Sequence, residues 1–163
     1  MAESQPMQMP TNGSGEPPLI VRGQYVKDLS FENPGAPQSL VNMAQAPAVD
    51  VNVNVAVNNV QGNDFEVVLT LNASAAQDGK PVFVVELAYA GVFSLNPSVP
   101  EEHKGPILLI ECPRLLFPFA RAIVADATRE GGFPPLMLQP IDFVAIYQQQ
   151  AANAQQQAKP ANA

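Results

Sequence analysis

The chain of 163 residues is long enough for one domain with a modest core, and 47% hydrophobic residues argue against disorder throughout. Eight basic against fifteen acidic residues give a net charge of −7, which disfavours binding to the phosphate backbone of nucleic acids. Only 14% of the residues are charged, so we expect another chain to cover part of the apolar surface.

The cysteine content and the hydropathy pattern predict where the protein works. Cys112 is the single cysteine, which excludes an intrachain disulfide and fits a reducing compartment. The N-terminal residues lack the basic and apolar regions of a secretory signal, and no segment approaches the roughly 18 apolar residues of a membrane span. We therefore expect a cytoplasmic protein without stable membrane insertion.

The first part of the chain predicts a tail followed by a strand. Residues 1–18 are rich in Pro, Gly, Ser and Gln and are expected to form a disordered tail. Residues 19–32, LIVRGQYVKDLSFE, predict a strand, in which Gly23 is expected to mark a bulge. Simple alternation puts one set of residues on one face (Asp28, Ser30, Glu32) and another set on the opposite face (Val21, Tyr25, Leu29, Phe31).

Three further strands are predicted at residues 48–60, 65–75 and 81–95, joined by the turns QGND and QDGK. The first of them, AVDVNVNVAVNNV, has a valine at every second position on one face (Val49, Val51, Val53, Val55, Val57). The short turns predict an antiparallel four-stranded meander. The last strand is apolar on both faces apart from Glu86, so oligomerisation is expected to cover one of them.

The C-terminal third changes to helical periodicity. Helices are predicted at residues 101–112 and 113–130, and the second is expected to end at Gly131. Pro118 should either kink this second helix or lie in its first turn. The apolar stripe of the second helix consists of Leu116, Phe119, Ile123 and Ala127. Residues 133–140, FPPLMLQP, are too rich in proline for a helix and too apolar for a free loop, so they are expected to lie on the fold. Asp142 is expected to cap a last helix, and residues 151–163 to form a flexible tail.

Catalytic chemistry is not expected from this composition. Cys112 lies beside an apolar run, which indicates packing rather than a nucleophile, and His103 lies in the charged string EEHK, which indicates a solvated surface. The spacing of Cys, His and carboxylates matches no metal site, and no phosphate-binding loop occurs. We expect neither an enzyme nor a bound metal or cofactor.

Two surfaces have a functional and a structural interpretation. Asp28, Glu32 and Glu86 would share a face if the first and fourth predicted strands were neighbours; such a face either keeps the sheet soluble or docks a basic partner. The apolar segment GGFPPLMLQPIDF, residues 131–143, is either a lid over the core or one wall of a groove for apolar peptides.

Three stretches together resemble the SecB family of tetrameric bacterial export chaperones: YVKDLSFENPGAP (residues 25–37), LLFPFAR (residues 115–121) and GGFPPLMLQPIDF. The resemblance covers roughly residues 19–150. It implies an α+β protomer with a four-stranded antiparallel sheet and two main C-terminal helices. It also implies a dimer of dimers, a homotetramer in which helices are buried between two eight-stranded sheets.

The resemblance further implies residue roles. Asp28, Glu32, Val84 and Glu86 match positions that dock the export ATPase SecA, through its basic, zinc-containing C-terminal tail. Val85, Leu87 and Tyr89 match positions at the interface between dimers. The chain departs from the family pattern in its Gln/Ala-rich tail, where the family is often acidic.

The implied function is that of an ATP-independent holdase, which keeps unfolded precursor proteins competent for translocation and delivers them to SecA. We expect the client groove to be lined by Val49, Val51, Val53, Phe133, Leu136, Leu138 and Phe143. Only the leading half of the valine row should form the groove floor, while the trailing half packs under a helix. A carrier of small apolar ligands that uses the same groove is the alternative.

Overall fold

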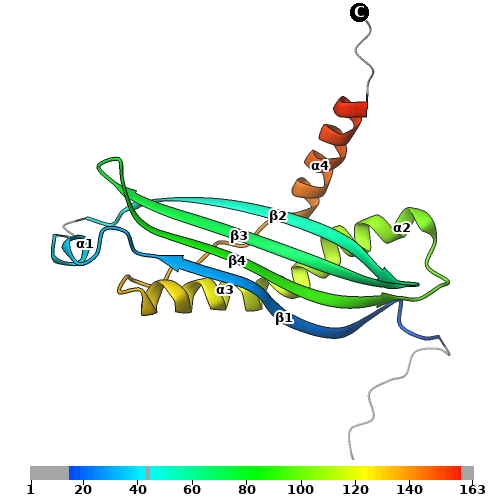
Figure 1. The fold of residues 1–163 in the computed structure, drawn as a ribbon. Coiled ribbons are helices and arrows are strands. Elements are labelled where there is room, and N and C mark those ends of the chain that lie inside the picture. Colours follow the sequence, from blue (N-terminus) through cyan, green and yellow to red (C-terminus); the bar gives the residue numbers. More distant parts are fainter. Residues whose placement is uncertain (1–14, 43–44, 159–163) are drawn as a thin grey trace, which may run out of the picture.

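The computed structural model describes residues 15–42 and 45–158. Its centre is one antiparallel sheet of four strands, β1 (Leu19–Glu32), β2 (Ala48–Gln61), β3 (Asp64–Gln77) and β4 (Lys80–Leu95) (Figure 1). The strand order is β1-β4-β3-β2. The predicted meander is therefore right for β2 to β4 and wrong for β1, because the segment that contains α1 (Gln38–Val41) is long enough to bring β2 to the far edge of the sheet.

Strand β1 carries two irregularities that decide which side chains share a face. Its pairing with β4 shifts between Val21 and Gly23 and again between Val26 and Asp28. The first shift confirms the predicted bulge at Gly23, whereas no sequence signal predicted the second. Since each bulge reverses the alternation, Tyr25 lies on the same face as Asp28, and not with Leu29 as simple alternation predicted.

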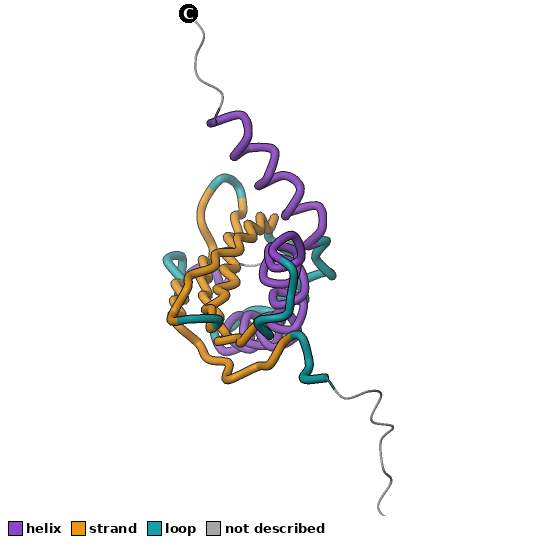
Figure 2. The backbone as a smooth tube through the Cα atoms, turned by 90° about the vertical axis from the view of Figure 1, so that its right-hand side faces the viewer, coloured by secondary structure: helices purple, strands orange, loops and turns teal. Residues whose placement is uncertain are grey.

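The helices cover one face of the sheet, while the other face is left open (Figure 2). One continuous helical rod comprises α2 (Glu101–Pro106), a π-helical stretch η1 (Ile107–Glu111) and α3 (Cys112–Glu130), and it continues through Pro118. Its predicted end is confirmed at Gly131 and Gly132; the latter adopts a φ of 93°, which favours glycine.

The last helix, α4 (Phe143–Ala158), begins with the predicted cap, since the Ala145 amide donates to Asp142 Oδ1 at 3.0 Å. It continues well past residue 150, where the flexible tail was expected to begin, and its second half projects away from the fold (Figure 1). Most of the predicted N-terminal tail and residues 159–163 lie outside the described residues.

The core lies between the sheet and α3. Residues Leu87 and Phe93 of β4 pack with Leu116 of α3, and all three are at most 1% exposed. The buried stripe of α3 follows Leu116, Ala120 and Val124, so the predicted stripe is wrong in its second member, because Phe119 is 53% exposed. The apolar surface of a single chain is thus incompletely covered.

This arrangement confirms the predicted α+β class, with a four-stranded antiparallel sheet followed by C-terminal helices. Among the described residues, no helix has both the length and the apolar character needed to cross a membrane.

Candidate functional site

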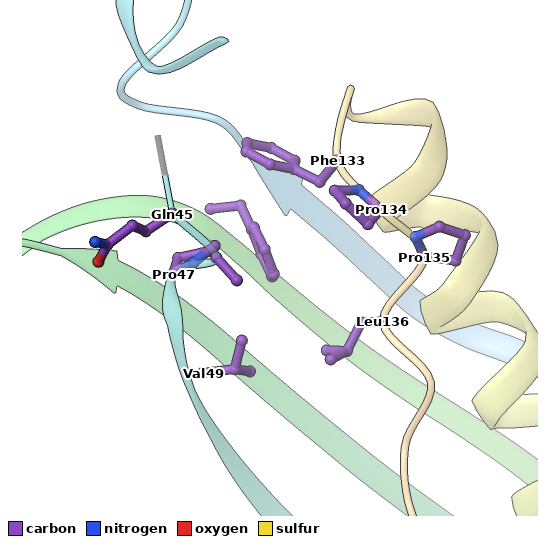
Figure 3. A pocket seen from close by; sticks show the side chains of 9 residues that line it. Gln45, Pro47, Val49, Phe133, Pro134, Pro135 and Leu136 are labelled. Carbon is purple, nitrogen blue, oxygen red and sulfur yellow. The ribbon is translucent and has the colours of Figure 1, made fainter. Parts of the chain in front are cut away.

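An apolar groove opens where the edge strand β2 faces the crossover segment, residues 131–142, between α3 and α4. Its first part has a volume of about 410 Å³. Figure 3 shows Val49 of β2 on one side and Phe133, Pro134, Pro135 and Leu136 of the crossover segment on the other, with Leu136 directed toward Val49. The remaining lining residues are Gln45, Ala46, Pro47 and Phe83.

A second cavity of about 400 Å³ extends the first along β2. The two share Val49 and Leu136, so they form one groove. The second is lined by Val49, Val51, Val53, Leu136, Met137, Leu138, Gln139 and Ile141. No charged side chain occurs among the lining residues of either cavity, all of which belong to the described ranges.

The structure brings together every residue predicted for the groove except Phe143. That side chain is 1% exposed and makes an edge-to-face contact with Phe117, with ring centroids 6.1 Å apart, so it belongs to the core. Sequence reasoning missed Phe83, Pro134 and Pro135. The two prolines lie inside the segment predicted as a groove wall, whereas nothing in the sequence indicated that Phe83 would lie at the groove's end.

The exposure of the valine row changes along β2. Val49 and Val51 are 40% and 37% exposed and form the floor of the groove, whereas Val55 is 6% exposed and packs in the core. Strand β2 contacts η1, and Val55 is buried in the same cluster as Leu108 and Ile110 of that element. One strand therefore supplies both a part of the groove lining and a part of the core.

The crossover segment is held in place by hydrogen bonds to α3. The Leu136 amide donates to Thr128 Oγ1 at 2.9 Å, and the Phe133 amide donates to the Thr128 carbonyl at 3.1 Å. Thr128 is fully buried, so its hydroxyl gives a rigid attachment for a segment without helix or strand. The ring of Phe133 packs against that of Phe83 at one end of the groove, with centroids 5.0 Å apart and the ring planes tilted by 50°.

The four residues predicted to dock a partner lie together on the open face of the sheet. Strand β1 is the direct neighbour of β4. The register pairs Asp28 with Ala88, Ser30 with Glu86, and Glu32 with Val84. Residues opposite each other in an antiparallel pair share a face, so Asp28, Glu32 and Glu86 lie with Val84 on one surface, here called the acidic face. All three carboxylates are exposed.

A hydrogen-bonded cluster lies on the same face nearer the other end of the sheet. The Tyr25 hydroxyl donates to Glu66 Oε2, and Lys27 Nζ donates to Glu66 Oε1 at 2.8 Å. Asn58 Nδ2 also donates to Oε1, at 3.3 Å. The bonds from Lys27 and Tyr25 lower the pKa of Glu66, while partial burial and the bond to Glu66 raise the pKa of Tyr25 to about 12. This cluster connects both edge strands to β3.

The Glu66 cluster makes stability depend on pH. Because the folded-state pKa of Glu66 is below its ordinary value of 4.5, the ionised form stabilises the fold above pH 4.5, and this contribution is lost as the pH falls through the folded-state pKa. We expect Glu66→Gln to lower the free energy of unfolding at pH 7, with the difference from the parent protein shrinking below pH 4.5. Urea titrations at several pH values measure this, with Glu102→Gln in exposed α2 as the control. A difference independent of pH would contradict this account.

The residues matched to the dimer–dimer interface lie inside the protomer. Val85, Leu87 and Tyr89 are 0%, 1% and 8% exposed, on the face of β4 that α3 covers. Tyr89 stacks on the exposed ring of Phe119, with centroids 6.3 Å apart. These three side chains support α3 from beneath, so a role in assembly would act through the position of that helix.

The two residues considered for catalysis do not form a reactive pair. Cys112 is completely buried, and burial raises the pKa of its thiol to about 12, which disfavours the thiolate. His103 is exposed on α2. Over residues 15–42 and 45–158, no three His, Cys, Asp or Glu side chains come together as a metal site would require.

Comparisons with known proteins agree with this geometry. The family model described as "Preprotein translocase subunit SecB" matches residues 12–154. The protein-export protein SecB of Paramagnetospirillum magneticum is 60% identical over 143 residues, covering 86% of this chain and 91% of that protein. Its counterpart from Rhodopseudomonas palustris strain TIE-1 is 53% identical over 156 residues, covering 92% and 99%.

A solved structure shows the same fold at low sequence identity. The SecB-like chaperone Rv1957 of Mycobacterium tuberculosis, solved in complex with a ChAD peptide from the HigA1 antitoxin, superposes with a TM-score of 0.64. It is 19% identical to this chain and covers 76% of it, while the match spans 91% of Rv1957. Together with the family match over nearly the whole chain, these likenesses show that the protein belongs to the SecB family of Sec-pathway protein-export chaperones.

Proposed function

We propose that this chaperone is an ATP-independent holdase that binds unfolded precursor proteins in the groove between β2 and the crossover segment. The observation that carries the proposal is the continuous, uncharged lining that the two cavities share through Val49 and Leu136. Burial of apolar side chains requires no sequence motif, so such a groove accepts many unfolded segments. Repeated weak contacts along one long client raise the overall affinity without making it specific.

A carrier of small apolar ligands fits the groove less well. Pockets for small molecules bury most of the ligand surface. Here, Val49 and Val51 on the floor and Met137 at the rim remain exposed, so a small ligand would stay partly in water. An extended chain segment lying along β2 uses this open shape, because its apolar side chains enter the groove while its polar groups stay solvated.

The uncovered apolar surface of the protomer supports assembly into a dimer of dimers. On the helix-covered side of the sheet, Val26 and Leu29 of β1 remain 47% and 45% exposed, and Leu115 and Phe119 of α3 remain 44% and 53% exposed. Strand β1 is also an edge strand with free backbone groups, which favours pairing with a second copy. Pairing through β1 gives an eight-stranded sheet, and two such dimers facing each other would bury their helices.

We further propose that the acidic face docks SecA, by attracting the basic tail of that ATPase. Asp28, Glu32 and Glu86 supply negative charge on the face that also carries the half-buried Val84, and all three carboxylates are exposed there. The groove lies at the other edge of the sheet, on β2, so docking and client binding use separate surfaces.

We place this activity in the cytoplasm. The free, buried thiol of Cys112 is compatible with that reducing compartment.

Glu86→Lys tests this separation. The reversed charge is expected to weaken binding of a peptide with the sequence of the SecA tail at least tenfold, because the lysine repels the basic peptide and offsets a neighbouring carboxylate. Affinity for a denatured precursor should stay within about twofold of the parent value, since Glu86 lies outside the groove lining. Calorimetric titration with each ligand measures both.

The matched control is Glu102→Lys, which reverses a charge on α2, away from the acidic face. It keeps the net charge of the Glu86→Lys protein, so it isolates the effect of position from that of total charge. Equal loss of both ligands in Glu86→Lys would contradict separate surfaces. Unchanged binding of the SecA tail would contradict docking at the acidic face.

A further inference from the structure

Met137 combines chemical reactivity with a place in the groove. It is 62% exposed, yet it lines the second cavity together with Val51 and Val53 of β2. Its neighbours Leu136 and Leu138 are more buried, so the extended crossover segment directs them toward the fold and leaves the Met137 thioether at the groove rim. The Met137 side chain is therefore open both to water and to a segment bound in the groove.

Within the described residues, Met137 and Cys112 are the two side chains that contain sulfur, and only Met137 is exposed. Met137 is the only methionine within residues 15–42 and 45–158, and the other four methionines of the chain lie outside those ranges. The remaining sulfur, that of Cys112, is fully buried. Burial protects its thiol from oxidants and also disfavours the thiolate, which is the form that reacts. An oxidant that enters the groove thus meets Met137.

We propose that Met137 is a modification site, at which oxidation by a peroxide lowers the affinity of the groove for apolar client segments. The inference rests on the proposed client-binding function of the groove. The methionine sulfur donates an electron pair to one oxygen of hydrogen peroxide, and the O–O bond breaks. That oxygen stays on the sulfur as the sulfoxide, while the other oxygen leaves with both protons as water. The sulfur is thus oxidised and the peroxide is reduced. An apolar, flexible rim residue becomes polar.

The expected consequence is a weaker and reversible interaction. A thioether contributes favourable contacts to apolar and aromatic side chains, and the sulfoxide oxygen must instead be kept hydrated. We expect about three- to tenfold weaker binding of an apolar probe after oxidation of Met137. Since methionine sulfoxide reductases convert the sulfoxide back to the thioether, treatment with them should restore the affinity.

The test uses the full chain and a fluorescein-labelled, extended peptide in which leucine and phenylalanine alternate with serine. Hydrogen peroxide is added in steps, the sulfoxide at Met137 is quantified by mass spectrometry of the digested protein, and affinity is measured by fluorescence anisotropy. Met137→Leu is the control: it keeps the apolar volume, cannot be oxidised at this position, and retains the other four methionines. Met137→Gln introduces a comparable polar group without oxidant.

The proposal predicts that affinity falls in proportion to the Met137 sulfoxide, that Met137→Leu resists peroxide, and that Met137→Gln binds weakly from the start. Equal losses in the parent protein and Met137→Leu, no loss despite complete oxidation, or a Met137 that stays reduced would each overturn it. Failure of the untreated parent protein to bind the peptide would instead count against the groove as a client site, so the two failures are distinguishable.

Discussion

Leu87→Arg is expected to prevent folding of the protomer. Leu87 is 1% exposed in the middle of β4, and its register partners are Leu71 of β3 and Leu29 of β1. Loss of the packed side chain alone costs about 2–5 kcal/mol, and an uncompensated buried charge adds several kcal/mol more. Together these approach the whole stability of a typical domain, about 5–15 kcal/mol. Circular dichroism and a thermal scan measure the loss.

Leu29→Arg is the matched control, because Leu29 faces the same side of the sheet beside Leu87 but is 45% exposed. The arginine can reach water there, so the protomer should fold. If that side of the sheet is buried on assembly, light scattering will show a smaller particle for Leu29→Arg. A cooperative, parent-like thermal transition for Leu87→Arg would contradict the place of Leu87 in the core.

Val51→Asp is expected to abolish most client binding while the fold persists. Val51 is 37% exposed on the groove floor, so a carboxylate there stays hydrated in the free protein. A bound apolar segment would have to strip that carboxylate of water and would lose its contact with the valine. We expect at least a tenfold weaker affinity for a denatured precursor, which corresponds to about 1.4 kcal/mol or more. Fluorescence anisotropy with a labelled precursor measures it.

Asn52→Asp adds the same charge one residue further along β2, on the opposite face of the sheet. It should bind the precursor as the parent protein does, and both variants should keep the parent thermal transition. Similar losses in the two variants would show that negative charge near β2, and not the groove floor, weakens binding. Unchanged binding of the precursor by Val51→Asp would contradict the groove as the client-binding surface.

The valine row shows how far the sequence alone predicts this site. Strict alternation from Val49 to Val57 predicts one apolar face, and the proline-rich crossover must lie on something apolar, so their meeting could be expected. The place where the row changes from groove to core depends on how η1 lies over the sheet, since Val55 is buried in one cluster with Leu108 and Ile110 of η1, whereas Val51 stays exposed. The position of a helix over a strand is a tertiary property without a local signal.

Strand β1 shows why the acidic face could be only partly predicted. Alternation along the strand correctly predicts that Asp28 and Glu32 share a face. They lie near Glu86 only because β1 is the neighbour of β4, and a meander of consecutive strands would not place β1 there. The bulge after Val26 has no glycine that would indicate it in the sequence, so simple alternation assigns Tyr25 to the wrong face. The Glu66 cluster depends on both features and was therefore missed.

Two aromatic residues lie elsewhere than predicted. Phe143 belongs to the core instead of the groove, and Phe119, predicted in the buried stripe of its helix, is exposed. Helical periodicity defines the buried face only to within about one residue. On α3 the small Ala120 is buried in place of Phe119, because a small side chain allows the helix to approach the sheet more closely than a bulky ring does. In our account, the displaced Phe119 contributes to the surface that assembly covers.

We expect this protein to hold unfolded precursors in its uncharged groove without nucleotide. The most direct measurement dilutes a denatured secretory precursor into buffer without ATP and follows its aggregation by light scattering, alone and with stoichiometric chaperone. We predict that the parent protein and Asn52→Asp delay aggregation, and that Val51→Asp does not. Aggregation that proceeds at the same rate with and without the parent protein would contradict the account.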